Sequence, residues 1–124
     1  MSEASEPSRA GPVFAPTTGS HYRNTDELDW QPSGTAGFWS KLLFEDPSTG
    51  ARTLLVRADA SVFAPIHVHD EIEQIYVLEG AFYDQNREVR AGDFVCRAPG
   101  DPHLSGSRDG ALALVVYLPV GPKS

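Results

Sequence analysis

Apolar and polar residues alternate along the chain in short runs, and no stretch shows a convincing 3.6-residue helical period over roughly 11 or more positions. Turn-forming Gly, Pro, Asp, Asn and Ser residues separate these runs, a pattern typical of all-β proteins. We therefore expect strands at residues 26–32, 38–45, 52–57, 62–69, 73–78, 81–84, 94–98 and 111–120. Short strands joined by tight turns predict a small barrel or jelly roll.

The ends of the chain differ from its middle in composition. Residues 1–20 are rich in Ser, Ala, Pro and Gly and offer little apolar surface to bury, so they are predicted to be a flexible tail. Residues 21–120 would form the β domain, and residues 121–124 a short C-terminal tail. A length of 124 residues fits a single domain.

A candidate metal site lies in the stretch from His67 to Gly80, together with a distant histidine. His67 and His69 are two residues apart, so on a strand both imidazoles leave the same face. Glu73 follows after a polar turn and opens the next predicted strand, which we expect to lie beside the first. His103 follows a Pro-Gly turn. Three imidazole nitrogens and one carboxylate oxygen are a ligand set for a divalent metal, although Glu73 can alternatively hold a histidine ring from outside the ligand set.

Two stretches resemble the sequence motifs of the cupin superfamily. Residues 67–80 meet every later fixed position of motif one, G-x5-H-x-H-x3,4-E-x6-G, and Ser61 stands where that motif opens with glycine. Motif two, G-x5-P-x-G-x2-H-x3-N, has Ala98 in place of its proline and Ser107 in place of its asparagine. Its remaining positions are met in spacing by Gly92, Gly100 and His103.

Residues 28–119 show a narrower resemblance, to the ChrR-type cupins. That group includes the metal-binding half of certain anti-sigma factors, and small stand-alone proteins similar to acetylacetone-cleaving and dihydroxyacetophenone-cleaving dioxygenases. The resemblance implies a single-domain cupin jelly-roll β-barrel with the metal inside one end. The dioxygenases are thought to hold iron on three histidines without a carboxylate, whereas the anti-sigma cupins hold zinc on three histidines and a glutamate. Glu73 therefore departs from the dioxygenase pattern.

The resemblance implies one divalent metal ion per chain, on His67, His69, Glu73 and His103. We favour Fe2+ and keep Zn2+, Mn2+ and Ni2+ open. The leading hypothesis is an Fe(II)-type oxygenase acting on a small dicarbonyl or hydroxyaryl ketone. A zinc-binding sensor or interaction module is the first alternative. The second is a non-oxidative isomerase or cyclase in which Glu73 or a metal-bound hydroxide serves as base.

Strand parity also suggests which side chains line the substrate pocket. Phe63 shares the predicted face of His67, and Ile75 shares that of Glu73, so both are pocket candidates. Tyr117, on the closing strand, is a third candidate. Tyr83 falls on the opposite parity and is expected to pack elsewhere. Pro65 lacks an N–H, which predicts a bulge or a sheet edge at that point.

Charge and composition narrow the list of partners. Ten Lys and Arg against 17 Asp and Glu give a formal charge of −7, which disfavours nucleic-acid binding. No apolar run approaches the length of about 18 residues needed to span a membrane. The expected partner is a small-molecule substrate, and the expected location is the cytoplasm.

Two further expectations concern the surface and the core. The single cysteine, Cys96, excludes an intrachain disulfide and is predicted to be a buried apolar thiol. A homodimer is expected, with Trp30, Phe38 and Trp39 as its candidate apolar patch.

Overall fold

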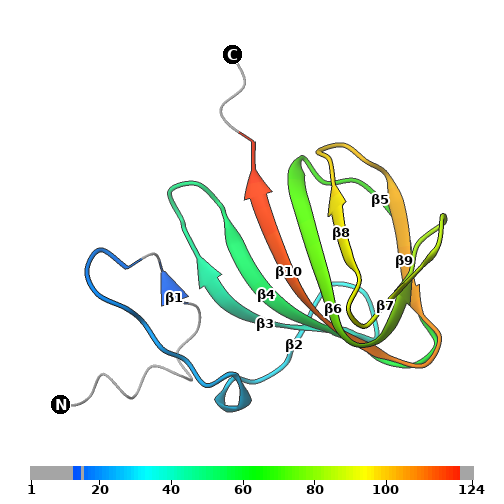
Figure 1. Ribbon diagram of the computed structural model, residues 1–124, viewed down its shortest axis with the longest axis horizontal. Helices are drawn as coiled ribbons and strands as arrows, with labels where there is room; N and C mark the ends of the chain where they lie inside the picture. The colour runs from blue at the N-terminus through cyan, green and yellow to red at the C-terminus, as the bar shows by residue number, and fades with distance from the viewer. Residues whose placement is uncertain (1–12, 15, 121–124) are drawn as a thin grey trace.

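The computed structural model describes residues 13–14 and 16–120, and its regular structure is almost entirely β (Figure 1). Among these residues the only helix is a short 3-10 turn, η3 (Thr25–Glu27). The all-β prediction is confirmed. The strands are β1 (Val13–Phe14), β2 (Gln31–Pro32), β3 (Phe38–Glu45), β4 (Arg52–Ala58), β5 (Val62–His67), β6 (Glu71–Tyr83), β7 (Glu88–Arg90), β8 (Phe94–Arg97), β9 (His103–Ser107) and β10 (Ala111–Pro119).

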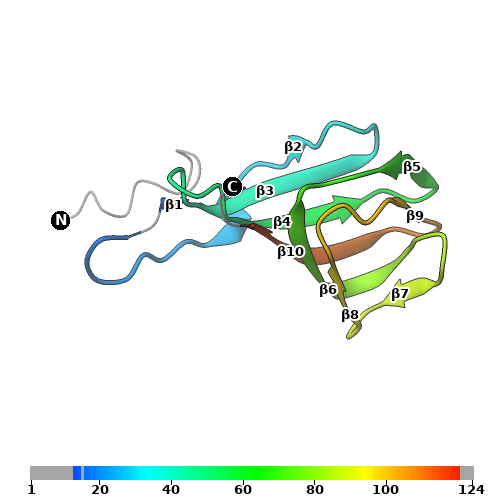
Figure 2. The same cartoon turned by 90° about the horizontal axis from the view of Figure 1, so that it is seen from above.

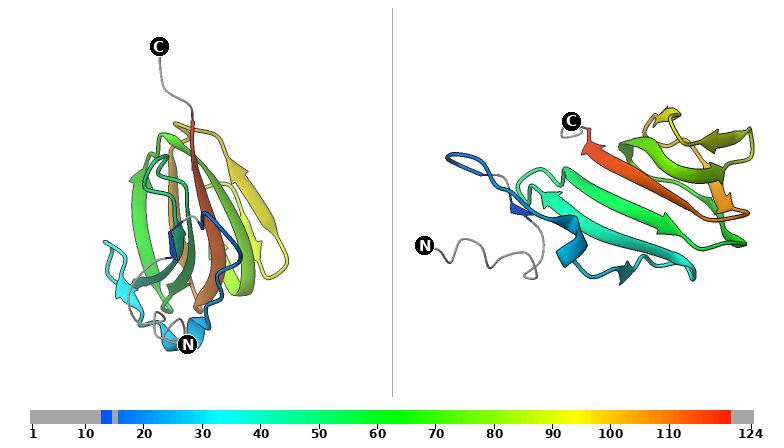
Figure 3. Two further views of the ribbon diagram at one scale, coloured as in Figure 1. Left: turned by 90° about the vertical axis from the view of Figure 1, so that its left-hand side faces the viewer. Right: turned by 60° about the horizontal axis from the view of Figure 1, so that its bottom comes forward.

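The strands form one curled sheet in the order β1-β3-β4-β10-β6-β9-β5, with β2 paired to β3 and both β7 and β8 paired to β6. The curl brings β5 and β9 opposite β3, β4 and β10 across the interior (Figures 1 and 2). Figure 3 shows the same curl from two further directions. The inward side chains from the two sides of the curl meet in the interior. They form the core and also line a cavity.

Small apolar side chains from neighbouring strands make up the core. Val77 on β6 and Ala113 on β10 are fully buried cross-strand partners. Val89 and Val115 complete this cluster. A second cluster joins Phe38, Ala58 and Ala64 at the point where β3 and β4 approach β5.

Strand β6 is longer than the sequence pattern predicts. The two strands expected at 73–78 and 81–84 are one strand of 13 residues, which also includes Glu71 and Ile72 from the expected turn. Gly80 does not end the strand. It has a φ of 68°, and the ladder between β6 and β10 shifts register beside it. The glycine therefore permits a bend within a continuous strand.

Two other regions differ from the expected secondary structure. The strand expected at 26–32 is η3 followed by the two-residue β2. No strand was expected at 103–107, where His103 opens strand β9. The sequence of β9, HLSGS, lacks apolar alternation and does not favour a strand by itself. Its pairing with β5 stabilises the extended conformation.

The expected N-terminal tail contains one short strand. Val13–Phe14 pairs in parallel with Phe44–Glu45 of β3. Residues 1–12, 15 and 121–124 lie outside the described residues, so the division into a tail at 1–20, a domain at 21–120 and a tail at 121–124 stays a prediction.

The expectation of a buried thiol at Cys96 is wrong. Strand β8 alternates, with Val95 and Arg97 facing the cavity, and Cys96 therefore lies on the exposed outer face. Phe38 is also misplaced in the candidate dimer patch, because it belongs to the core. Trp39 lies beside it on the other face of β3, where its indole N–H donates to Asp59.

Within the part of the chain that the structure describes, no helix has the length and apolar character required to cross a membrane.

The bend at Gly80 generates a stability prediction. A β-carbon at Gly80 would overlap the carbonyl oxygen of Gly110, whereas one at Gly92, also at positive φ, would meet nothing within 4 Å. Gly80→Ala should therefore lower the free energy of unfolding by about 2 kcal/mol or more, because steric overlap adds to backbone strain. Gly92→Ala, the matched control, should cost only about 1 kcal/mol. Urea unfolding of both variants measures the difference, and equal losses would contradict a special role for Gly80.

Candidate metal centre

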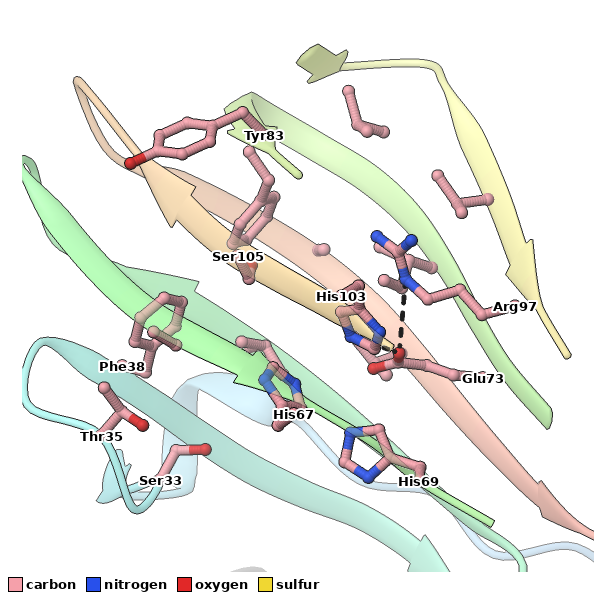
Figure 4. Close-up of a pocket in the computed structure, with 18 of the residues that line it drawn as sticks. Ser33, Thr35, Phe38, His67, His69, Glu73, Tyr83, Arg97, His103 and Ser105 are labelled. Carbon is pink, nitrogen blue, oxygen red and sulfur yellow. Dashed lines mark ion pairs between the residues drawn. The ribbon is translucent and has the colours of Figure 1, made fainter. Parts of the chain in front are cut away.

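The three expected histidines lie together at one end of the curled sheet. His67 ends β5, His69 follows two residues later, and His103 opens β9 directly across from His67. One ligand nitrogen from each ring can be chosen so that all three lie within 4.8 Å of one another. The structure thus brings the three imidazoles to a single point (Figure 4).

Backbone carbonyls orient two of these rings. His67 Nδ1 lies 2.9 Å from the carbonyl oxygen of Pro65, and His103 Nδ1 lies 3.1 Å from that of Asp101. A carbonyl only accepts, so the tautomer of a neutral ring that fits this contact carries its proton on Nδ1 and keeps a free lone pair on Nε2. Burial lowers the pKa of His103, which favours the neutral form that ligates metals.

Glu73 presents a buried carboxylate to the same point. Its Oε2 accepts a hydrogen bond of 2.9 Å from the Tyr117 hydroxyl. Its Oε1 is buried, makes no hydrogen bond and lies 3.4 Å from His103 Nε2. Two ligand atoms, each about 2.1 Å from a shared metal, are about 3.4 Å apart at tetrahedral angles and about 3.0 Å apart at right angles. Two facing acceptors at this spacing therefore fit a cation between them.

Glu73 reaches the histidines by a different route from the one expected. β5 is not a hydrogen-bonded neighbour of β6. It pairs with β9, and the curl of the sheet brings β9 and β6 together. Glu73 has Arg97 of β8 and Tyr117 of β10 as cross-strand partners. It is also outside the group of ligand atoms that lie within 4.8 Å of one another, which contains only the three histidines.

Arg97 and Asp84 are site residues that the sequence analysis missed. Arg97 Nε lies 3.6 Å from Glu73 Oε1, and its Nη1 donates to Asp84 Oδ2 at 3.0 Å. Burial by itself would raise the pKa of Asp84, but hydrogen bonds from the Asn86 and Arg87 N–H groups and from Arg97 hold it below its ordinary value. No signal in the sequence pointed to Arg97, because the expected burial of Cys96 placed its neighbour Arg97 on the outer face.

Tyr117 connects the histidines, the carboxylate and a second arginine. Its ring centroid lies 5.4 Å from that of His69, and Arg52 Cζ lies 4.3 Å from the Tyr117 ring centroid. Burial, together with the adjacent Glu73 carboxylate, raises the pKa of Tyr117 far above its ordinary value. The phenol is therefore neutral and donates a hydrogen bond to Glu73 Oε2.

A cavity of about 350 Å³ opens beside these residues and extends through the curl of the sheet. Most of its wall is apolar. The pocket candidates Ile75 and Tyr117 line it, as expected. Hydroxyl groups also line it, from Ser33, Thr35, Tyr83 and Ser105.

Two expectations about the pocket side chains, for Phe63 and Tyr83, are wrong. Phe63 does not line the cavity and is 53% exposed. The ladder between β5 and β9 shifts register between Ala64 and His67, as expected for Pro65, and this shift reverses the parity before His67. Tyr83 also lines the cavity, together with its neighbour Phe82.

The sequence model of the ChrR cupin-like domain family matches residues 18–121. The chain belongs to this family. The cupin resemblance and the jelly-roll expectation are therefore confirmed. A search of curated protein sequences finds no match.

Solved cupin structures share this fold at low sequence identity. A putative acetylacetone dioxygenase from Methylibium petroleiphilum PM1 superposes with a TM-score of 0.74 at 19% identity, over 87% of this cupin and 85% of that chain. The acetylacetone dioxygenase from Acinetobacter johnsonii superposes with a TM-score of 0.72 at 16% identity, over 84% of this cupin and 76% of that chain. A chain of the complex between SigE and the anti-sigma ChrR from Rhodobacter sphaeroides superposes with a TM-score of 0.65 at 23% identity, over 77% of this cupin and 52% of that chain.

The buried pair of Asp84 and Arg97 generates a prediction about pH. A carboxylate with a lowered folded-state pKa stabilises the fold above its ordinary pKa of 3.8 and loses this effect as the pH falls through the lowered value. Asp84→Asn should therefore reduce the free energy of unfolding by about 1–3 kcal/mol at neutral pH. The deficit should shrink below about pH 4. Denaturant titrations between pH 3 and 7 measure it, with exposed Asp109→Asn as control, and a deficit that grows on acidification would contradict the assignment.

Proposed function

We propose that this cupin is a metal-dependent oxygenase that acts on a small dicarbonyl or hydroxyaryl ketone. The observation that carries the proposal is the set of converging acceptors at the cavity wall. Two imidazole Nε2 atoms with free lone pairs and a buried carboxylate oxygen without a hydrogen bond meet beside a third histidine. Acceptor atoms that converge with free lone pairs are a favourable site for a cation.

His67, His69 and His103 would hold one divalent metal, and Glu73 would be the fourth ligand. We favour Fe2+, and the same donor set also accepts Zn2+, Mn2+ or Ni2+. When bound, Fe2+ would supply the redox chemistry that a reaction with O2 requires, and it would draw electron density from the oxygen atoms of a chelating ketone. Glu73 holds negative charge beside the metal and can accept a proton from an acidic carbon of the substrate.

The cavity supports a small and largely apolar substrate. Its volume of about 350 Å³ is near the lower end of the usual range for ligand pockets. Side chains such as Phe38, Ile75 and Phe82 would exclude water from the substrate. The hydroxyls of Ser33 and Ser105 offer polar contacts to substrate oxygens. The names of the two dioxygenases with this fold add support to the same substrate class.

A zinc-binding sensor or interaction module is the second candidate, and Glu73 is the observation that favours it. Four protein ligands close a tetrahedral zinc site and leave no position for a substrate. The anti-sigma ChrR complex has a chain with this fold. A third candidate is a non-oxidative isomerase or cyclase with Glu73 as the base.

Removing a histidine should remove the metal. His69→Ala and His103→Ala should each lose most of the bound metal, because either change deletes one of three strong nitrogen donors. His21→Ala is the matched control, since His21 is exposed and lies far from the site in the sequence. Elemental analysis after purification without added metal gives the content. Full occupancy in both site variants would show that the histidines are not the ligands.

Glu73→Gln separates the candidates. If three histidines are sufficient for an iron oxygenase, the variant should keep its metal and retain altered O2 uptake. If Glu73 closes a zinc site, loss of its negative charge should weaken binding by about 10–100-fold or more, and folding stability should fall with the metal. Metal content and O2 uptake with a panel of 1,3-diketones and hydroxyaryl ketones measure both outcomes after iron reconstitution. An iron-loaded wild type that consumes no O2 with any member would refute the oxygenase for these substrates.

We also propose a homodimer. Tyr76 and Phe94 are cross-strand neighbours on the outer face of β6 and β8 and are 45% and 59% exposed. Exposed Leu78 lies nearby on β6. Light scattering at tens of micromolar should give twice the mass of one chain, and Phe94→Ser should shift it toward the single-chain mass. A single-chain mass for the unaltered protein would rule the dimer out.

A further inference from the structure

We infer that Arg97 is a positioning residue that holds the Glu73 carboxylate in place for the metal, and that Asp84 holds Arg97 in turn. The inference rests on the proposed metal site and deepens it. Asp84, Arg97 and Glu73 form a chain of charges that runs from a turn between strands to the histidine cluster.

These three charged side chains are almost entirely buried. The exposed fractions are 10% for Arg97, 8% for Glu73 and 6% for Asp84. A buried charge is costly unless it is paired, so this arrangement is stable only while each member faces its partner. The backbone enforces the contact between Arg97 and Glu73, because they are directly opposed in the ladder of β6 and β8.

Asp84 anchors the far end of the guanidinium. It lies in the turn after β6, where its Oδ1 accepts from the N–H groups of Asn86 at 2.8 Å and Arg87 at 3.0 Å. Its Oδ2 accepts from Arg97 Nη1 at 3.0 Å. With both oxygens engaged, Asp84 cannot turn away, and the guanidinium plane is fixed by the turn.

Arg97 in turn limits where the Glu73 carboxylate can point. Tyr117 binds Oε2, which leaves Oε1 between two neighbours, Arg97 Nε at 3.6 Å and His103 Nε2 at 3.4 Å (Figure 4). Oε1 and Arg97 Nε are both buried without a hydrogen bond. The guanidinium charge keeps Oε1 on the side of His103, whereas Tyr117 alone would leave the carboxylate free to rotate.

The net charge of the group also suits a cation. Two carboxylates and one guanidinium leave one negative charge, and Glu73 places that charge beside the three imidazole rings. Asp84 thus offsets the charge of Arg97, so that Arg97 can orient Glu73 without adding net positive charge where a dication binds.

Co2+ binding to the metal-free protein tests the inference without any assay of turnover. The absorption spectrum of bound Co2+ reports its ligands, and titration gives the affinity. Arg97→Gln should weaken Co2+ binding by about 10–100-fold, the range for groups that orient ligands, and should change the spectrum in the same direction as Glu73→Gln does. Arg97→Lys should restore part of the affinity. Arg90→Gln, at an exposed arginine on neighbouring β7, should bind as the wild type does.

The double variant Arg97→Gln/Glu73→Gln gives the decisive comparison. Arg97 acts through Glu73, so the double variant should bind Co2+ no more weakly than Glu73→Gln alone. A double variant whose loss equals the product of the two single losses would overturn the inference, as would wild-type affinity in Arg97→Gln. If Arg97→Gln does not fold, Asp84→Asn replaces it in the experiment. Asp84→Asn should lower the Co2+ affinity by a smaller factor, and it should cause no further loss when Glu73→Gln is already present. A wild type that binds neither Co2+ nor Zn2+ would instead refute the metal site itself.

Discussion

Strand β6 belongs to both halves of the curled sheet, and the interior of the molecule depends on the bend it makes at Gly80. Before the bend, β6 pairs with β10 and β8 and carries Glu73 and Val77. After the bend, it pairs with β7 and touches β9 at Gly106. A straight strand would keep β9 in the plane of the first half and leave His103 far from Glu73. The backbone freedom of one glycine thus helps to place the candidate ligands and to close the cavity.

The histidines of the candidate metal site could be identified from local spacing in the sequence. The residues that contact Glu73 could not, because those contacts depend on the curl of the sheet. Two histidines at i and i+2 share a face in any regular strand, and a short turn before β9 is enough to present His103. The contact between Arg97 and Glu73 instead requires knowing that β8 pairs with β6. Nothing in the sequence of either strand specifies that pairing by itself.

Parity arguments were correct where the ladders are regular and wrong where they shift. Ile75 lies in the regular part of β6 and lines the cavity as expected. Phe63 precedes the irregular step before His67 and points outward, and Phe82 follows the register shift in β6 and packs against the core. In β8, Val95 faces the cavity and Cys96 faces solvent, whereas Cys96 was expected to be buried. The inward face of β8 could be assigned only once its pairing with β6 was known. A bulge reverses every later assignment on its strand.

The irregular step at Pro65 has a consequence for how molecules of this protein meet one another. β5 is the last strand in the sheet order, so one side of its backbone is free of strand partners among the described residues. It also exposes Phe63 and Ile66. An apolar strand with a free edge is a template for aggregation by strand addition. Pro65 lacks a backbone donor and the ladder slips beside it, so a foreign strand cannot pair along the full length. The distortion that aims His67 into the cavity therefore also guards the edge of the sheet against polymerisation.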